Sequence, residues 1–517
     1  MNVDTNQPRR TVEGTSKDDT RSGGSLEEIA YAALVADRFE PELDDAAKME
    51  LSVLRSAASA NANAHANANA HASLGATVQD LRHVLWSSID NAESRDLDQV
   101  EWVEARTDGS LRVLIGVADV DSAVPRGSAL DQHAFANSTS VYTGVRVYPM
   151  LPPEISTDLT SLNQGQDRRV MVVEIVLARD GAIVSHDVYP ALVINHAKLD
   201  YVAVGAWLEG HGPVPELVAS TSGLEAQIRL QDRAARLLEH QRDAAGALEF
   251  ETIEATPTTK DGKVAGLTVT RKNRARDLIE NFMVSANVAI AQILAERGRS
   301  AIRRVVHEPK RWSRIVDIAR GHGVELPVEA SAKALSGFLA ARRAADPARF
   351  ADLSLAIVKL LGPGEYLVDL PGPLDDKGHF GLAASDYAHA TAPNRRYSDL
   401  VTQRLVKATL ADAPPPYTDA ELAQIAAHCT ERENAANHVE RIVRKAAAAS
   451  LLSDQVGATF DAIVTGVNRE GTYVRLISPP AEGRVTRGQE EMDVGERVRV
   501  RLLSTDQRKG HIDFEGV

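Results

Sequence analysis

The segment over residues 88–99 constrains the fold most, because it gathers carboxylates at the end of an apolar run. Asp90, Asp96 and Asp98 lie within nine positions, directly after the apolar approach of residues 84–89. Such a cluster repels itself unless a cation lies between its members. Oxygen ligands without a nearby Cys or His pair suit Mg²⁺ or Mn²⁺ better than Zn²⁺. The spacing alone favours a plainer interpretation, a solvated acidic turn, so the rest of the chain must decide.

The composition is that of an ordinary soluble protein, long enough for about two to four domains. The chain has 517 residues, 44% of them apolar and 25% charged, and a single cysteine, Cys429. One cysteine excludes an internal disulfide framework and a cysteine-based zinc site. Residues 1–24 lack the apolar core of a signal peptide, and no apolar run approaches the ~20 residues that cross a bilayer. We therefore expect a cytoplasmic protein with no membrane partner.

The net charge of −14, from 58 basic and 72 acidic residues, argues mildly against a nucleic-acid partner, because Lys and Arg drive binding to phosphate. Basic residues are nevertheless concentrated in two stretches, 271–276 and 296–314. These stretches are consistent either with a focused basic channel inside an acidic body or with ordinary solvated helix ends. The charge distribution leaves both interpretations open.

Hydrophobic periodicity predicts an α+β fold whose secondary structure changes along the chain. Residues 76–200 read mostly as strands and turns, and helices dominate over residues 222–345. The clearest helix covers residues 276–297, and another opens with a capping box and covers residues 418–452. The residues from 459 onward alternate in the manner of a small β-barrel.

The N-terminal part of the chain has a different character. We expect residues 1–24 to be disordered and residues 25–57 to form a small helical segment that opens with a capping box at Ser25. A low-complexity tract of Ala, Asn and His follows over residues 58–75. We interpret this tract as a linker rather than as a metal-binding segment.

Several later blocks accompany the acidic segment in a definite order. They include Gly116-Val-Ala-Asp119, Thr139-Ser-Val-Tyr142, Tyr148-Pro-Met-Leu-Pro152, the stretch from Ser156 to Arg168, His307-Glu-Pro309, and the stretch from Tyr387 to Asp399. Together these blocks resemble the RNB catalytic domain of the RNase II and RNase R family, over about residues 78–450. One block alone is weak, whereas this many in order predicts the family.

The resemblance implies an RNB catalytic domain over residues 76–453, with mixed sheets and packed helices, and an OB-fold β-barrel over residues 454–517. It also implies hydrolysis of single-stranded RNA from the 3′ end, with release of nucleoside 5′-monophosphates. The expected partner is therefore single-stranded RNA. No sequence feature points to an obligate protein partner, so we expect a monomer. Family members usually begin with two cold-shock OB-folds, and residues 1–75 are too few and too helical to form them.

The resemblance implies that Asp90, Asp96 and Asp98 hold Mg²⁺ or Mn²⁺, with Asp96 and Asp98 as catalytic residues and Asp98 the most important. The family usually has a fourth carboxylate at the next position, where this chain has Gln99. A Gln carbonyl can still coordinate the cation, but it carries no formal charge. We therefore expect weaker metal binding than four carboxylates give.

Arg395 matches the catalytic arginine that clamps the reacting phosphate in the family, and Arg396 is a second candidate for RNA contact. A guanidinium offers two parallel hydrogen bonds to phosphate oxygens, which Lys cannot copy. The usual Ser and Ile of this motif are Ala392 and Asn394 here, so we expect a slightly different loop.

Other residues match positions at which the family contacts RNA. Stacking on aromatic rings tolerates any base, as a general degrading enzyme requires, and a glutamate can read the ribose 2′-hydroxyl. Isolated aromatics are more often core residues, and that alternative stays open for each. The candidates are Tyr142 and Tyr201 beside the terminal nucleotides, Phe250 as a base clamp, Glu280 at the ribose, Glu440, and Tyr473 in the barrel.

Two other functions stay open. Gln99 is compatible with a non-catalytic RNA-binding or regulatory protein that kept the channel and the barrel. The lack of cold-shock domains slightly favours a specialised nuclease for short oligoribonucleotides or transfer-RNA 3′ ends. We prefer an active exoribonuclease, because the other carboxylates and the arginine motif are intact.

Overall fold

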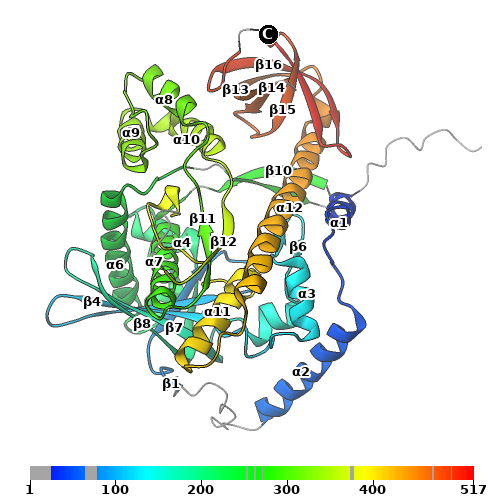
Figure 1. Cartoon of the computed structure of the whole chain (residues 1–517). Helices are drawn as coiled ribbons and strands as arrows, with labels where there is room; N and C mark the ends of the chain where they lie inside the picture. The colour runs from blue at the N-terminus through cyan, green and yellow to red at the C-terminus, as the bar shows by residue number, and fades with distance from the viewer. Residues whose placement is uncertain are drawn as a thin grey trace, which may run out of the picture.

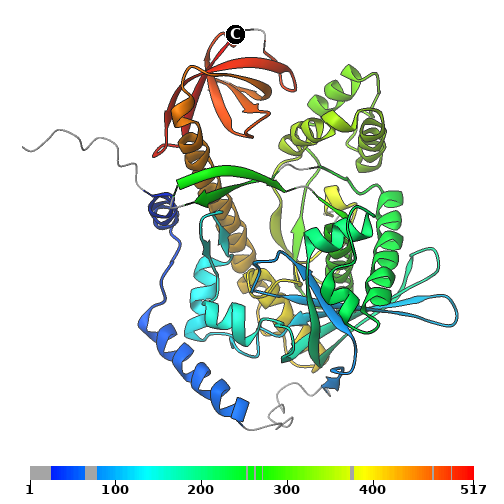
Figure 2. The same ribbon diagram turned by 180° about the vertical axis from the view of Figure 1, so that it is seen from behind.

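The protein is described by a computed structural model in which a mixed α/β body is joined by one long helix to a C-terminal barrel (Figure 1 and Figure 2). The residues that it describes are 25–63, 78–251, 254–260, 263–270, 272–372, 378–468, 471–490 and 492–517. The predicted disordered tail lies outside these residues, as does most of the predicted linker. The predicted α+β class is confirmed.

The α/β body is organised around a six-stranded mixed sheet. Its strands are β1 (Gln79–Asp80), β2 (Trp86–Asp90), β3 (Gln99–Ala105), β4 (Leu111–Ala118), β7 (Asp167–Leu177) and β8 (Ile183–Asp200). They lie in the order β1-β8-β2-β3-β4-β7, and β7 also pairs with β8, so the sheet curls back on itself. β8 is long because its first part pairs antiparallel with β7 and its last part pairs parallel with β2.

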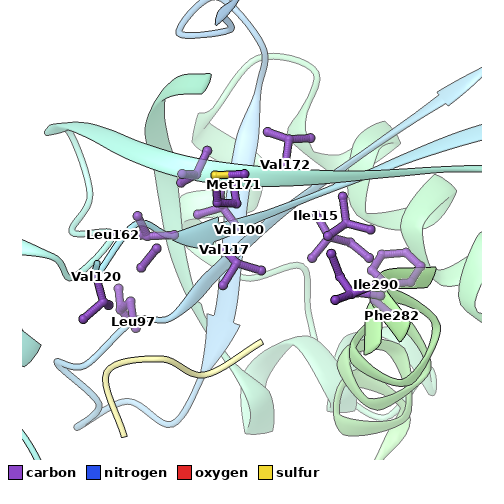
Figure 3. Packing of buried hydrophobic residues seen from close by; sticks show 14 of the residues in the cluster. Leu97, Val100, Ile115, Val117, Val120, Leu162, Met171, Val172, Phe282 and Ile290 are labelled. Carbon is purple, nitrogen blue, oxygen red and sulfur yellow. The ribbon is translucent and has the colours of Figure 1, made fainter. Parts of the chain in front are cut away.

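The core of the α/β body lies between this sheet and the helix α7 (Arg274–Glu296). Leu278, Phe282 and Leu294 on α7 are fully buried. Figure 3 shows Phe282 and Ile290 pointing from α7 toward Ile115 on β4. The predicted helix is confirmed, and its apolar stripe is the face that the sheet covers.

α7 also has the length and apolarity of a membrane-spanning helix, although the sequence contains no uninterrupted apolar run of that length. The mean hydropathy of its most apolar stretch is 1.5, and 72% of that stretch is buried inside the protein. Burial of this kind is what a core helix requires. α7 is the one helix with these properties in the described ranges.

Other elements cover the sheet or connect its strands. They are α3 (Ala129–Asn137), β5 (Val141–Tyr142), β6 (Val147–Tyr148), the π-helix η1 (Glu154–Leu159), α4 (Tyr201–Leu208), α5 (Glu216–Ser220) and α6 (Leu224–Ala245). On α6, the Gln227 side chain binds the backbone of β3: it accepts a hydrogen bond from Val103 N–H at 2.7 Å and donates one to Val103 O at 3.0 Å.

A helical lobe has an apolar cluster of its own and contacts the barrel through charged residues. Asp352 pairs with Arg475 at 3.1 Å, and Lys359 pairs with Glu482 at 3.2 Å. The lobe and the strands beside it are β11 (Ala301–Val305), α8 (Trp312–Gly321), α9 (Ala332–Ala345), α10 (Pro347–Leu361), β12 (Glu365–Asp369) and the short 3-10 helix η2 (Phe380–Leu382).

The long helix α12 (Asp419–Leu452) begins at the predicted capping box, where Thr418 and Glu421 bind each other's backbone N–H groups. It follows α11 (Tyr397–Leu410) and leads through η3 (Ser453–Gln455) into the barrel. The barrel strands are β13 (Thr459–Asn468), β14 (Gly471–Leu476), β15 (Glu482–Arg487), β16 (Arg497–Asp506) and β17 (His511–Gly516). They close in the order β13-β14-β15-β17-β16, which confirms the predicted barrel.

A hairpin interrupts the stretch in which we predicted mainly helices. Its antiparallel strands are β9 (Glu254–Lys260) and β10 (Lys263–Thr270), and they lie against α12 and close to α1 (Leu26–Ala36) (Figure 1 and Figure 2). We did not predict this hairpin. The dipeptide Asp261-Gly262 is the sequence signal that indicates it, because Asp-Gly is typical of two-residue hairpin loops.

The N-terminal helical segment packs on the α/β body and on α12. α1 (Leu26–Ala36) opens with the predicted capping box and buries Ala30 and Leu34 in an apolar cluster that includes Val439 and Val443 of α12. α2 (Asp45–Asn63) runs into the tract that we interpreted as a linker. The alanines of that tract explain the extension, because Ala is the best helix former.

Replacing Phe282 with Ala tests the packing between α7 and the sheet. Phe282 is 0% exposed, so we expect the substitution to lower the free energy of unfolding by about 3–5 kcal/mol. Met49→Ala is the control, because Met49 is 71% exposed on α2 and its loss should cost less than about 0.5 kcal/mol. Urea unfolding followed by circular dichroism measures both. Equal midpoints for the two variants would contradict this core.

Candidate active site

The sheet brings the ends of three strands to one edge. β2 ends at Asp90, which pairs in parallel with Asp200 at the end of β8, so Tyr201 follows beside it. β3 runs antiparallel to β2 and begins at Gln99 on the same edge. Side chains that the sequence separates by about a hundred residues therefore meet because parallel strands end together.

Several backbone groups of the acidic loop between β2 and β3 are held by side chains of neighbouring elements. Lys198 Nζ donates hydrogen bonds to the carbonyl oxygens of Ala92, at 2.9 Å, and Ser94, at 2.5 Å. Ser161 Oγ accepts from Leu97 N–H at 3.0 Å. These contacts fix the loop and leave the aspartate side chains to face a pocket.

Asp98 is the most buried carboxylate of the pocket, with 1% of its side chain exposed. Its Oδ1 accepts a hydrogen bond from Asn394 N–H at 3.0 Å, and its Oδ2 accepts one from Arg395 Nε at 3.1 Å. Burial raises the pKa of Asp98 to about 7, although Arg395 and Asn394 N–H act in the opposite direction. The Arg395 side chain stays 42% exposed, so part of its guanidinium faces the pocket.

The segment that carries Tyr142 lies directly beside the loop that precedes α11 and carries Asn394 and Arg395. We call this loop the arginine loop. Ser140 N–H donates to Arg395 O at 3.0 Å. Tyr142 OH donates to Asp96 Oδ2 at 3.1 Å, and Tyr142 N–H donates to Glu440 Oε1 at 2.9 Å. Glu440 thus holds the backbone of Tyr142 from behind, although it does not line the pocket itself.

Asp90 also lines the pocket, at the end of β2. Its Oδ1 accepts hydrogen bonds from Asn91 N–H at 2.7 Å and Ser94 Oγ at 3.0 Å. Burial raises its pKa despite these two donors. Nearby Glu101 is fully buried, and neither of its oxygens has a hydrogen-bond partner among the described residues. Burial and the Asp90 charge raise the pKa of Glu101 well above its ordinary value.

α7 supplies the floor of the pocket. Glu280 pairs with Lys272 at 2.8 Å and with Arg242 at 3.4 Å. Burial acts to raise the pKa of Glu280, but these two cations outweigh it and the pKa lies below its ordinary value. One and two turns further along lie Met283 and Asn287, which share the same helix face.

The resulting cavity has a volume of about 280 Å³. Nine predicted site residues line it together, namely Asp90, Asp96, Asp98, Gln99, Tyr142, Tyr201, Glu280, Arg395 and Arg396. Three others do not line it. Phe250 packs against the apolar cluster of the helical lobe, Glu440 binds the Tyr142 backbone, and Tyr473 lies on β14 of the barrel.

Arg395 and Arg396 differ in their surroundings. Both Nε and Nη2 of Arg396 donate to the Asp399 carboxylate, at 2.8 and 2.7 Å. Asn394 departs from the family pattern, and its buried side chain accepts a hydrogen bond from Thr160 Oγ1 at 2.5 Å while its N–H serves Asp98. The departure therefore leaves the backbone contact to Asp98 in place.

The sequence interpretation missed several pocket residues. Asn91 and Ser94 lie in the acidic loop, and Tyr387 and Thr391 lie in the block before Arg395. Met283 follows Glu280 by three residues on α7, so helical spacing could have identified it. In the parts of the chain that the structure describes, no group of three or more His, Cys, Asp or Glu side chains is arranged to hold a metal ion.

The comparisons with known proteins agree with this geometry. The family model of the RNB domain matches residues 78–412. The chain belongs to the RNB family. The model of the RNase II-type exonuclease C-terminal S1 domain matches residues 458–517, which include the barrel.

Curated RNB relatives are named ribonuclease R. Ribonuclease R 1 of Lactococcus lactis is 27% identical over 470 residues, which are 84% of this chain and 56% of the relative. Ribonuclease R of Vibrio cholerae is 30% identical over 481 residues, with 84% and 56% covered. Ribonuclease R of Escherichia coli is 28% identical over 470 residues, with 84% and 57% covered. The chain spans just over half the length of these relatives.

Solved structures show the same RNB fold. The apo form of Mycoplasma genitalium RNase R has a TM-score of 0.82 at 22% identity, over 95% of this chain and 78% of that one. The same values describe that protein in complex with ribose methylated single-stranded RNA. Yeast Ssd1, a pseudonuclease, has a TM-score of 0.63 at 19% identity, over 79% and 50% of the two chains. At these identities the likeness establishes the fold.

The raised pKa of Asp98 predicts a pH-dependent stability for this RNB protein in the absence of metal. Between the ordinary pKa of 3.8 and about 7, the folded protein keeps a proton that the unfolded chain releases. That stabilisation is complete below the pKa of Asp98 in the unfolded chain, and it is lost as the pH rises through the pKa of Asp98 in the folded protein. We expect wild type in EDTA to lose stability relative to Asp98→Asn between about pH 5 and about pH 8.

Chemical unfolding of both proteins at several pH values measures this difference. The Asn side chain does not titrate, so whatever packing cost it brings is the same at each pH. A stability difference that does not change with pH would contradict the raised pKa of Asp98.

Proposed function

We propose that this protein is a 3′→5′ exoribonuclease that hydrolyses single-stranded RNA to nucleoside 5′-monophosphates. The observation that carries the proposal is the shared contact at Asp98, where an acidic loop and an exposed guanidinium meet in one polar cavity. Membership of the RNB family and the relatives named ribonuclease R support it. We also propose a monomer in the cytoplasm, which the sequence predicts.

Arg395 is the side chain best suited to the scissile phosphate. Its Nε is committed to Asp98, and 42% of the side chain remains exposed. A guanidinium in this position can bind two non-bridging oxygens and offset the charge that develops on them. Arg396 is tied to Asp399 through two nitrogens, so we assign it a supporting role.

Asp98 is the candidate for moving a proton. Each of its oxygens receives one hydrogen bond and retains a second lone pair. With no cation on it, burial raises the pKa of Asp98 to about 7, so a free Asp98 carboxylate can accept a proton from an attacking water molecule at neutral pH. The oxygen of that water then bonds to phosphorus, and the 3′-oxygen of the preceding nucleotide leaves.

The aromatic and acidic walls suit a terminal nucleotide of RNA. Tyr142 and Tyr201 both line the cavity. Their rings can stack on a base of any identity. Glu280 is held in place by Lys272 and Arg242, and we propose that it accepts a hydrogen bond from a ribose 2′-hydroxyl.

The donor set of the cavity fits Mg²⁺ or Mn²⁺ through Asp90, Asp96, Asp98 and the Gln99 carbonyl. All are oxygen donors, but no group of three acidic or histidine side chains within the described ranges forms a ready cage. Mg²⁺ at phosphoryl-transfer sites commonly takes one or two carboxylates and completes its shell with substrate phosphate and water. When bound, such a cation polarises the phosphate and acidifies water.

A second candidate is an RNA-binding protein without nuclease activity. Gln99 favours it, because an amide in place of a carboxylate removes one negative charge from the cation site. The pocket, Arg395 and the barrel would then serve RNA binding alone. A specialised nuclease for short oligoribonucleotides or transfer-RNA ends differs from the main proposal in where shortening stops.

Asp98→Asn tests the proposal. The variant keeps the side-chain shape and removes the charge, so we expect unchanged RNA binding and turnover reduced by more than about a hundredfold. Asp45→Asn on α2 is the matched control, because the Asp45 side chain is fully exposed. The measurement follows a 5′-labelled single-stranded RNA with Mg²⁺ or EDTA on a sequencing gel, and chromatography identifies the released nucleotide.

Each outcome of this measurement separates the candidates. Stepwise shortening that needs Mg²⁺ and fails in Asp98→Asn supports the exoribonuclease. Intact RNA that stays bound to wild type favours the non-catalytic protein, and arrest at a defined length favours the specialised nuclease. Undiminished monophosphate release by Asp98→Asn would refute the role of Asp98.

Gln99→Asp tests the cation site separately from activity. A carboxylate at this position adds negative charge to the pocket, so we expect Mn²⁺ to bind about tenfold more tightly. Gln132→Asp is the control, because Gln132 is exposed on α3. Electron paramagnetic resonance of free Mn²⁺ during a titration gives both affinities. Unchanged or weaker binding in Gln99→Asp would argue against a cation at Gln99.

A further inference from the structure

Arg276 joins two parts of the pocket wall that lie far apart in the sequence. Its guanidinium carbon lies 4.5 Å from the centre of the Tyr201 ring. Its Nη2 donates a hydrogen bond to Asn91 Oδ1 at 2.8 Å. Tyr201 and Asn91 both line the cavity, whereas Arg276 does not. A single side chain outside the cavity thus contacts an aromatic wall and the acidic loop at once.

The contact with Asn91 leads directly to a candidate carboxylate ligand. Asn91 N–H donates to Asp90 Oδ1 at 2.7 Å, and Ser94 Oγ donates to the same oxygen at 3.0 Å. The path from the Tyr201 ring to the Asp90 carboxylate therefore contains Arg276 and Asn91 alone. Each step in it is a contact within hydrogen-bonding or cation–π range.

The geometry of a guanidinium explains why an arginine is needed at this position. Its flat face can lie over an aromatic ring while an edge N–H donates to an acceptor in its own plane. A lysine ammonium lacks the flat face and the fixed fork. Arg276 contacts the Tyr201 ring from outside the cavity, and Tyr201 itself lines the cavity, where a base can reach it.

We propose that Arg276 is a positioning residue that couples stacking of the 3′-terminal base on Tyr201 to the placement of the Asp90 carboxylate. The inference rests on the proposed exoribonuclease function and deepens it. A base that stacks on Tyr201 holds the ring against Arg276, and Arg276 holds the Asn91 turn. The RNA strand thereby helps to set the geometry of the site that cleaves it.

The remainder of the acidic loop has independent anchors. Lys198 binds the carbonyls of Ala92 and Ser94, and Ser161 binds Leu97 N–H. Loss of the Arg276 contact should therefore loosen the Asp90–Asn91 turn without releasing the whole loop. This makes substitution of Arg276 a usable test.

The test compares two RNAs that differ by one base. Both carry a 5′ label, and one has an abasic 3′-terminal nucleotide. Single-turnover rates at saturating protein remove differences in binding and report the chemical step. In wild type we expect the abasic end to slow the first cleavage by about tenfold, because stacking on Tyr201 is lost. In Arg276→Met the ratio of the two rates should fall by about threefold or more.

A merely structural role for Arg276 gives a different result. It would lower both rates equally in Arg276→Met and leave their ratio at the wild-type value. That outcome would overturn the coupling, as would a wild-type ratio near one. Arg276→Lys keeps the positive charge but lacks the planar fork of guanidinium N–H groups. We therefore expect its ratio of the two cleavage rates to lie between those of wild type and Arg276→Met.

Asn91→Ala removes the acceptor and leaves the guanidinium in place. It should reproduce the low ratio, and combining it with Arg276→Met should lower the ratio no further, because both variants break one contact. A wild-type ratio in Asn91→Ala would overturn the proposal even if Arg276→Met folds poorly.

Arg229→Met is the matched control. Arg229 lies over the Trp207 ring at 4.7 Å and pairs with Glu225, and neither it nor Trp207 lines the cavity. Its loss should leave the ratio unchanged. Failure of wild type to shorten either RNA would instead refute the exoribonuclease function itself, so the two failures are distinguishable.

Discussion

The contact of Asp98 with the loop before α11 is the interaction around which the pocket is built. Asn394 N–H and Arg395 Nε bind the two oxygens of a side chain that is 1% exposed, across almost three hundred residues of sequence. Burying a carboxylate is costly unless it is hydrogen-bonded and paired. The acidic loop and the arginine loop therefore hold each other at a fixed distance. The sheet edge supplies one wall of the cavity, and the segment before α11 supplies the other.

Features with a local signal could be predicted from the sequence. The apolar stripe of α7, the capping box of α12 and the alternation of the barrel strands all appear where their patterns indicate them. The motif blocks also predicted nine residues that line one cavity. These residues meet because β2 and β8 end, and β3 begins, at the same edge of the sheet. Whether those residues act as proposed stays a prediction.

Features that depend on tertiary contact had no local signal. The backbone N–H of Asn394 carries no side-chain pattern, and Arg276 contacts Asn91 from 185 residues away. Phe250 has an aromatic side chain of the kind that contacts RNA, but it packs against the helical lobe. Tyr473 lies in the barrel, as predicted, and its contact with RNA stays a prediction. Glu101 is fully buried on β3, and periodicity alone does not distinguish it from a solvated residue on an alternating strand.

The most direct test of the central claim is an experimental structure of the Asp98→Asn protein with Mg²⁺ and a short single-stranded RNA. The account predicts the 3′-terminal nucleotide inside the cavity, its phosphate against Arg395 and its base against Tyr142 or Tyr201. An RNA strand that enters with its 5′ end, or one that binds elsewhere and leaves the cavity free of nucleotide, would contradict the account.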